Sequence, residues 1–176
     1  MVIIPADAAV RRSGVRWATC AIGAGILAAD QVSKNLVLTL DPASGRLAGG
    51  WVTVHLIRNT GASDGIGAAY PTVVTLAGFV IAALAGTLAL RTQSRAVALC
   101  LAAVLAGAAG NLADRVFRSP GLGRGAVVDW IHVAGSRASF NVADLAIQLG
   151  ALGTVIAMLA IRPGARPPVQ LPAELP

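Results

Sequence analysis

The 176-residue sequence contains few charged and few aromatic side chains, at 12% and 4% of its residues. Soluble domains usually contain about 25% charged residues. In contrast, 56% of this sequence is apolar, and its mean hydropathy is +0.72. This composition excludes an ordinary soluble domain and predicts an integral membrane protein.

Cysteine is also scarce, since the sequence has only Cys20 and Cys100. Each lies within an apolar run, which excludes a disulfide framework and a metal-binding spacing, so we interpret both as small packing residues. The formal charge is +6. However, the basic residues form short clusters beside apolar runs, where anionic lipid and membrane topology explain them. We therefore predict no nucleic-acid binding.

The apolar runs predict four membrane-spanning helices, because about 20 apolar residues cross a ~30 Å hydrocarbon core. The run from Pro71 to Leu90 contains no charged residue. The run from Trp17 to Ala29 is too short to span alone, so the first span must continue through Asp30 and Lys34. The predicted spans cover about residues 16–38, 71–90, 96–113 and 139–161.

Two longer connections, about residues 41–69 and 114–137, separate these spans. Within them, Trp51–Ile57 alternates in polarity and is rich in β-forming residues, and Ala126–Ile131 is also typical of a strand. We predict one all-α membrane domain over residues 1–176, with a small β-rich cradle outside the bilayer. The Pro-rich segment 163–176 is predicted to be disordered.

The orientation of the chain rests on its basic residues. Lys and Arg divide evenly between the two predicted sides, but those on the side of the termini lie close to the span ends. Because the first span usually dominates, we place both termini in the cytoplasm and both connections at the outer face. No small-x-small cleavage site stands out after the basic start, so we interpret the first span as a retained anchor.

Polar residues mark the predicted outer ends of the first and third spans. Asp30 and Lys34 are i,i+4 neighbours in the favourable order for a helical ion pair. They either neutralise each other at the interface or order a functional site. Asn111, Asp114 and Arg115 share one helix face at spacings of three and four residues, and we expect the adjacent cation Arg115 to keep Asp114 ionised.

Asp129 and Asp144 differ from the other acids, because neither has a Lys or Arg within four residues. Both lie in apolar sequence, where loss of water favours the neutral carboxyl. Asp144 also shares a helix face with Asn141 and Gln148. Two such carboxyls brought together would share one proton and could activate a water molecule, as in aspartic proteases.

Polar groups that could hold a peptide beside this pair are Asn59, Asn111, Asn141 and Arg115. From spacing alone another interpretation stays open, in which Asp129 is a loop residue and Asp144 is a helix acid stabilised by the helix dipole.

Five motifs occur in order along the chain: Asp30-Gln-Val-Ser-Lys34, Arg58-Asn-Thr-Gly-Ala-Ser63, Gly107-Ala-Ala-Gly-Asn-Leu-Ala-Asp-Arg115, Val127-Val-Asp-Trp-Ile131 and Phe140-Asn-Val-Ala-Asp144. Over about residues 15–161 the chain resembles lipoprotein signal peptidase (signal peptidase II), a bacterial four-span aspartic protease. The resemblance implies that Asp129 and Asp144 are the catalytic dyad. It implies substrate binding or support of the dyad for Asn59, Gly61, Asn111, Asp114, Arg115, Asn141, Asp30 and Lys34. Asp64 stands where the family usually has Phe.

The resemblance also implies the reaction, which is cleavage of a prolipoprotein signal peptide just before a diacylglyceryl-modified cysteine. The expected location is the bacterial inner membrane, with the active site at its outer face. The expected partners are lipid-modified prolipoprotein signal peptides and membrane lipid, and we expect a monomer. No metal or organic cofactor is implied.

Three alternatives remain. A small ion-coupled transporter or channel could use intramembrane carboxylates, although nothing polar marks the midplane of the second and third spans. A serine-type protease could use Ser63 or Ser139 with His55 or His132, but no Gly-x-Ser-x-Gly run is present. The chain could also be a non-catalytic assembly subunit that packs through its small-residue third span.

Overall fold

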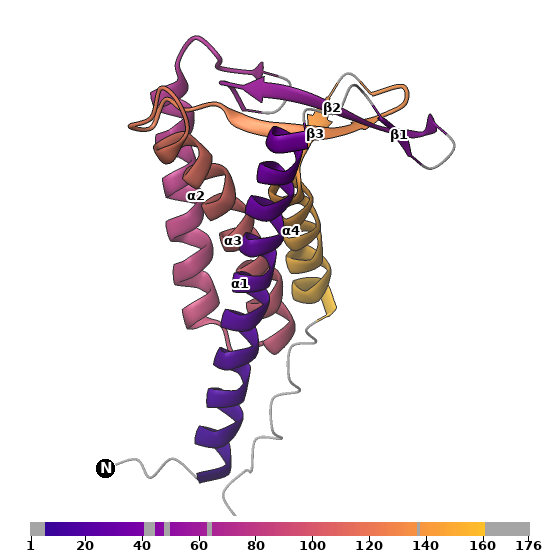
Figure 1. The fold of residues 1–176 in the computed structure, drawn as a ribbon. Helices are drawn as coiled ribbons and strands as arrows, with labels where there is room; N and C mark the ends of the chain where they lie inside the picture. The colour runs from indigo at the N-terminus through magenta and orange to yellow at the C-terminus, as the bar shows by residue number, and fades with distance from the viewer. Residues whose placement is uncertain (1–5, 41–44, 48–49, 63–64, 137, 161–176) are drawn as a thin grey trace, which may run out of the picture.

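The computed structural model describes residues 6–40, 45–47, 50–62, 65–136 and 138–160, with only the backbone described for residues 6–16 and 45–47. Within these residues, four helices form a bundle and a small sheet lies across one end of it (Figure 1). The predicted disordered tail, Ser63 and Asp64 lie outside the described residues.

The helices are α1 (Ala6–Leu40), α2 (Pro71–Arg91), α3 (Arg95–Phe117) and α4 (Val142–Ala160). Three of them, α2, α3 and α4, are long and apolar enough to cross a membrane. The described part of α1 is not among these, because polar residues such as Asp30 and Lys34 interrupt its apolar run. Four spans therefore remain a prediction. With 35 residues, α1 would extend for ~50 Å, which exceeds the ~30 Å core of a bilayer.

Three helix boundaries differ from those expected from the sequence, and the first is the start of α1, at Ala6 instead of near residue 16. Helix α3 continues through Phe117, which places Asp114 and Arg115 in its last turns. Helix α4 begins later than expected, at Val142, because Ser139–Phe140 pairs with a neighbouring strand. The residue between that strand and α4 is Asn141, which caps the helix as described below.

Helix α3 lies at the centre of the bundle and packs against the other three helices. It is rich in Ala and Gly, so neighbouring backbones approach it closely. A Cβ added at Gly150 would lie 2.7 Å from the Cys100 carbonyl oxygen of α3. Cys100 thus packs between helices, as expected. Cys20, in contrast, is exposed on α1, so its interpretation as a packing residue was wrong.

The sheet consists of β1 (Gly45–Leu47), β2 (Val52–Asn59), β3 (Val127–Val133) and β4 (Ser139–Phe140), in that order and entirely antiparallel. Its two long strands come from the two predicted connections, which confirms a small β-rich structure beside the helices. Asn59 at the end of β2 pairs with Val127 at the start of β3. This register brings the Asn59 motif beside the Asp129 motif, about 70 residues further along the chain.

The close contact of α3 with α4 can be tested at Gly107. An added Cβ there would clash with the Ala143 carbonyl oxygen and lie 2.8 Å from Ile147 Cγ1. We expect Gly107→Ala to lower the free energy of unfolding by about 1–3 kcal/mol, since overpacking outweighs the better helix propensity of Ala. Thermal unfolding in detergent would measure this loss. The matched control is Gly25→Ala, where nothing lies within 4 Å of the added Cβ, and equal melting temperatures for the two variants would contradict the prediction.

Candidate active site

Two acids from distant parts of the chain meet at one cavity. Asp129 lies on β3 and Asp144 lies in the first turn of α4, and both line a cavity of about 250 Å³. Asn141 joins them, because its side-chain Nδ2 donates to Asp129 Oδ1 at 2.7 Å and its backbone N–H donates to Asp144 Oδ2 at 3.1 Å. Only 3% of Asp129 is exposed, and Asp144 is partly buried.

Asp144 owes its position to the start of α4. The Asn141 side-chain Oδ1 accepts from the Asp144 backbone N–H at 2.9 Å, while Asp144 Oδ2 accepts from the Asn141 backbone N–H. This reciprocal pair is a capping box, which satisfies two donors at a helix N-terminus. Asp144 is therefore a helix-capping acid and a member of the carboxyl pair at the same time. The two interpretations that the sequence left open do not exclude each other.

The second oxygen of each acid accepts a hydrogen bond from another asparagine. Asn59 Nδ2 donates to Asp129 Oδ2 at 3.0 Å, and Asn111 Nδ2 donates to Asp144 Oδ1 at 2.8 Å. Asn59 also accepts from the Gly61 backbone N–H at 2.9 Å. A Cβ at Gly61 would lie 2.5 Å from the Gly65 backbone, so this turn requires glycine.

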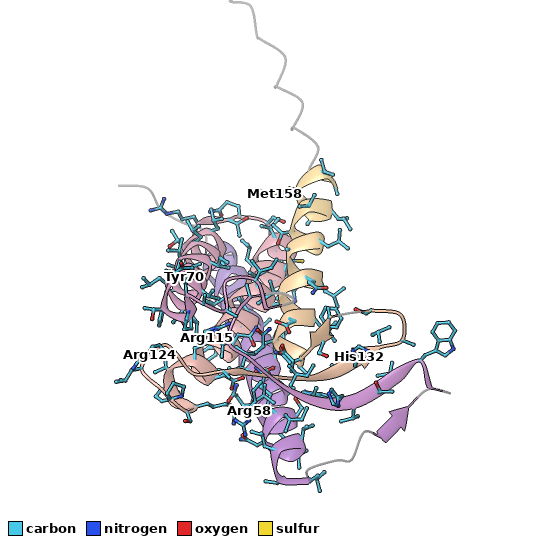
Figure 2. The ribbon with its side chains drawn as sticks, turned by 90° about the horizontal axis from the view of Figure 1, so that it is seen from above. Arg58, Tyr70, Arg115, Arg124, His132 and Met158 are labelled. Carbon is cyan, nitrogen blue, oxygen red and sulfur yellow. The ribbon has the colours of Figure 1, made fainter. Side chains whose placement is uncertain are left out.

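Arg115 does not contact the carboxyl pair through a hydrogen bond in the described structure. Its guanidinium donates to the Thr60 and Gly61 carbonyl oxygens instead, which ties the turn after β2 to α3. Figure 2 shows Arg115 near the middle of the molecule, where the helix ends meet the sheet, and His132 further out along β3. Arg115 therefore positions the turn that carries Asn59.

A buried ion cluster lies behind the pair. Lys34 Nζ lies 2.8 Å from Asp30 Oδ2 and 2.9 Å from Asp114 Oδ2, and all three side chains are fully buried. The third acceptor of Lys34 is Asn111 Oδ1, at 3.0 Å. Gly110 leaves room for this cluster, since a Cβ there would lie 2.5 Å from Asp30 Oδ2.

The carboxylates of this cluster also hold two backbone N–H groups. Asp30 Oδ1 accepts from Ala143 N at 2.9 Å, and Asp114 Oδ2 accepts from Val128 N at 3.1 Å. Ala143 directly precedes Asp144, and Val128 directly precedes Asp129. Of the two roles left open for the Asp30–Lys34 pair, the structure therefore favours ordering of the site.

Two members of this cluster are not among the site residues predicted from the sequence. Arg118 Nε pairs with Asp114 Oδ1 at 2.6 Å, whereas the expected neighbour Arg115 turns elsewhere. Residues four apart on a helix lie on the same face, so the i,i+4 spacing could have revealed Arg118. Gln31 donates to Asp30 Oδ2 at 3.0 Å and to the Gly110 carbonyl oxygen at 3.1 Å.

The environment of Asp129 shifts its titration. Burial raises the pKa of Asp129 from 3.8 to about 6, and the charge of Asp144 adds to the rise, while hydrogen bonds from Asn59 and Asn141 and the charge of Lys34 oppose it. The carboxyl of Asp129 thus keeps its proton to a higher pH than an exposed aspartate does. A pair of this kind can hold one proton and act as acid and base.

The serine alternative finds less support. Ser139 Oγ lies 3.5 Å from His132 Nδ1, as a cross-strand pair between β3 and β4. His55 is exposed. Within the described part of the chain, no group of three His, Cys, Asp or Glu residues is placed to hold a metal ion.

The fold is similar to those of two solved structures. One solved structure, titled as a bacterial membrane enzyme at 2.3 Å resolution, matches with a TM-score of 0.71 and 25% identity and covers 81% of this chain and 87% of that one. A second bacterial membrane enzyme structure, at 1.9 Å, has a TM-score of 0.68 and 21% identity, covers 81% of this chain and 93% of that one, and supports the fold alone.

The sequence comparisons identify the family. The family model described as signal peptidase (SPase) II matches residues 22–160, and the chain belongs to this family. The lipoprotein signal peptidase of Streptomyces griseus is 41% identical over 110 residues, which cover 62% of this chain and 56% of that protein. That of Mycobacterium avium is 38% identical over 137 residues, which cover 77% of this chain and 75% of that protein. The chain spans little more than half the length of the Streptomyces relatives that it matches.

The raised pKa of Asp129 predicts a pH-dependent stability. Between pH 3.8 and about 6 the folded protein keeps a proton that the unfolded chain has lost. The free energy of unfolding should therefore fall as the pH rises through this window, by up to ~3 kcal/mol from this group. In detergent, the melting temperature of the wild type should fall more between pH 4 and 6 than that of Asp129→Asn. Parallel curves for the two proteins would exclude the shift.

The ion cluster predicts a large loss of stability for Lys34→Met. This change leaves Asp30 and Asp114 buried without their shared cation, and removing one partner of a buried ion pair destabilises by about 3–5 kcal/mol. The control is Arg124→Met, because Arg124 is exposed (Figure 2) and forms no ion pair within the described residues. Thermal unfolding of both variants measures the difference. A Lys34→Met protein as stable as Arg124→Met would disprove a structural role for the cluster.

Proposed function

We propose that this chain is an aspartic endopeptidase that removes the signal peptide from prolipoproteins, just before the lipid-modified cysteine. The observation that supports this best is the contact of Asn141 with both Asp129 and Asp144. Membership of the signal peptidase II family supports the same activity. The roles of the individual residues follow from their contacts.

In the proposed reaction the two carboxyls share one proton around a water molecule. The Asp144 carboxylate takes a proton from the water, whose oxygen attacks the scissile carbonyl carbon. Asp129, whose pKa is raised to about 6, gives its proton to the carbonyl oxygen and forms a neutral tetrahedral intermediate. The C–N bond then breaks as the leaving nitrogen takes a proton from Asp144, and Asp129 recovers its proton from the forming carboxyl product.

The asparagines would hold this arrangement in place. Asn59, Asn111 and Asn141 donate neutral N–H groups to the carboxyl oxygens. A neutral donor orients a carboxylate without bringing a full positive charge next to it, so the pair can still hold a proton. Arg115 and the cluster around Lys34 would act one step further away, by fixing the backbone and the Asn111 amide.

The cavity suits a substrate that enters from the membrane. Its apolar walls come from α2, α3 and α4, and they include Val74, Ala77, Gly78, Ile81, Ala108, Leu112 and Ile147. A second cavity of about 610 Å³ shares Asn59, Asp129 and Ser139 with the first. A signal peptide would occupy the apolar side, and the lipid-modified cysteine with the residues after it would leave toward the sheet.

The proposed location is the bacterial inner membrane, with the site at the outer face, both termini in the cytoplasm and α1 as a fourth span. The partners would be prolipoprotein signal peptides and membrane lipid, and the enzyme would act as a monomer. The transporter and assembly-subunit alternatives are not favoured by the family match.

The decisive experiment uses two conservative variants. Asp129→Asn and Asp144→Asn should each lower the cleavage rate of a diacylglyceryl-modified prolipoprotein by at least about a thousandfold, because neither amide can share the proton. Both proteins should still insert and fold. Gel shift of the purified precursor in detergent measures the product.

His132→Ala is the control that separates mechanisms. A serine mechanism would need the ring nitrogen beside Ser139, so loss of activity in His132→Ala together with turnover by Asp129→Asn would favour that alternative. Near-normal turnover by either Asn variant would rule out the proposed pair.

A further inference from the structure

Gln148 is a polar side chain in α4 to which the proposed reaction gives no role. It lies one helical turn after Asp144 and lines the same cavity. Four residues along a helix correspond to ~6 Å of rise and about 40° of rotation, so Gln148 lies on the Asp144 face but deeper in the predicted membrane. The α2 wall of this cavity consists of Val74, Ala77, Gly78 and Ile81.

The other polar side chains of the cavity are already paired. Each forms at least one hydrogen bond, and they are Asn59, Asn111, Arg115, Asp129, Ser139 and Asp144. Within the described part of the chain, the Gln148 amide forms none, and this side chain is exposed. A side-chain amide at membrane depth is unfavourable unless it finds a partner, so its position indicates a ligand with polar groups.

A cleaved substrate would supply such groups. The peptide must unfold locally to an extended form to reach the carboxyl pair, and an extended backbone in the bilayer has N–H and C=O groups without partners. A glutamine amide offers one acceptor and two donors, so it can bind the N–H and the C=O of one residue together. The ~6 Å between Asp144 and Gln148 corresponds to about two residues of extended chain at ~3.3 Å each.

We propose that Gln148 binds the substrate backbone about two residues before the scissile bond and holds that segment extended. This assignment rests on the proposed function, in which the signal peptide occupies the membrane side of the cavity. Gln148 thereby replaces the hydrogen bonds that the substrate helix loses as it opens. Because the contact forms on binding and persists through the reaction, its loss should raise KM more than it lowers kcat.

The first test compares Gln148→Met with the wild type on a lipid-modified precursor peptide. Methionine has a similar length and no amide, and we expect kcat/KM to fall about tenfold, mostly through KM, as for the loss of two neutral hydrogen bonds. The control is Thr154→Val, also on α4, where the lost hydroxyl bonds only to its own helix at the Gly150 carbonyl oxygen. The control should retain wild-type kinetics, and all three proteins should show similar melting temperatures.

The second test changes the substrate. A precursor with an ester in place of the amide N–H of the residue two positions before the scissile bond removes one partner of Gln148. The kcat/KM of the wild type should be about threefold to tenfold lower on the ester than on the amide precursor. Gln148→Met should cleave the two precursors with equal kcat/KM, because the substitution and the ester remove the same contact. If the substitution only disturbed the structure, Gln148→Met would lower kcat/KM by the same factor on the ester and on the amide precursor.

The outcomes separate the two proposals. Wild-type kinetics for Gln148→Met, or losses from the variant and the ester that multiply, would overturn the role of Gln148 while leaving the protease intact. Failure of the wild type to cleave the lipid-modified precursor that carries the normal amide would overturn the proposed function, and the role of Gln148 with it.

Discussion

The arrangement of the site depends on one fully buried cation. Lys34 joins Asp30 of α1 to Asp114 of α3, and each carboxylate also accepts the backbone N–H that precedes one acid of the pair. Burial of three charges is unfavourable unless every lone pair and proton is used, and here the backbone of α4 and β3 supplies the missing donors. The carboxylates of the cluster therefore hold the backbone beside Asp129 and Asp144, and this fixes the position of both acids.

Between this cluster and the carboxyl pair lies a layer of neutral amides. Asn111 accepts from Lys34 on one side and donates to Asp144 on the other, so the cation determines which way the amide points. The Asn111 side chain thus separates the charge of Lys34 from Asp144. A cation in direct contact would keep the carboxyls ionised, whereas the amides orient them and leave Asp129 with a raised pKa.

Several features of the site could be predicted from the sequence, but the partner of Asp114 could not be read from adjacency along the chain. Asp129 and Asp144 stood out by their apolar surroundings, and Asn59, Asn111 and Asn141 by their motifs. Asp114 was given the wrong partner, because Arg115 is adjacent in sequence but points about 100° away on the helix, while Arg118 follows one turn later. For Asp114 the helical period, and not adjacency in the sequence, decides which cation forms the ion pair.

The sequence alone determined the apolar helices, the two strand-forming connections and the identity of the candidate site residues, because periodicity and composition are local properties. The tertiary structure decided which of these side chains meet. The pairing of β2 with β3, the capping of α4 by Asn141 and the approach of α1 to Gly110 each join segments far apart along the chain. Contacts of this kind depend on how helices and strands pack, and that packing has no local signature.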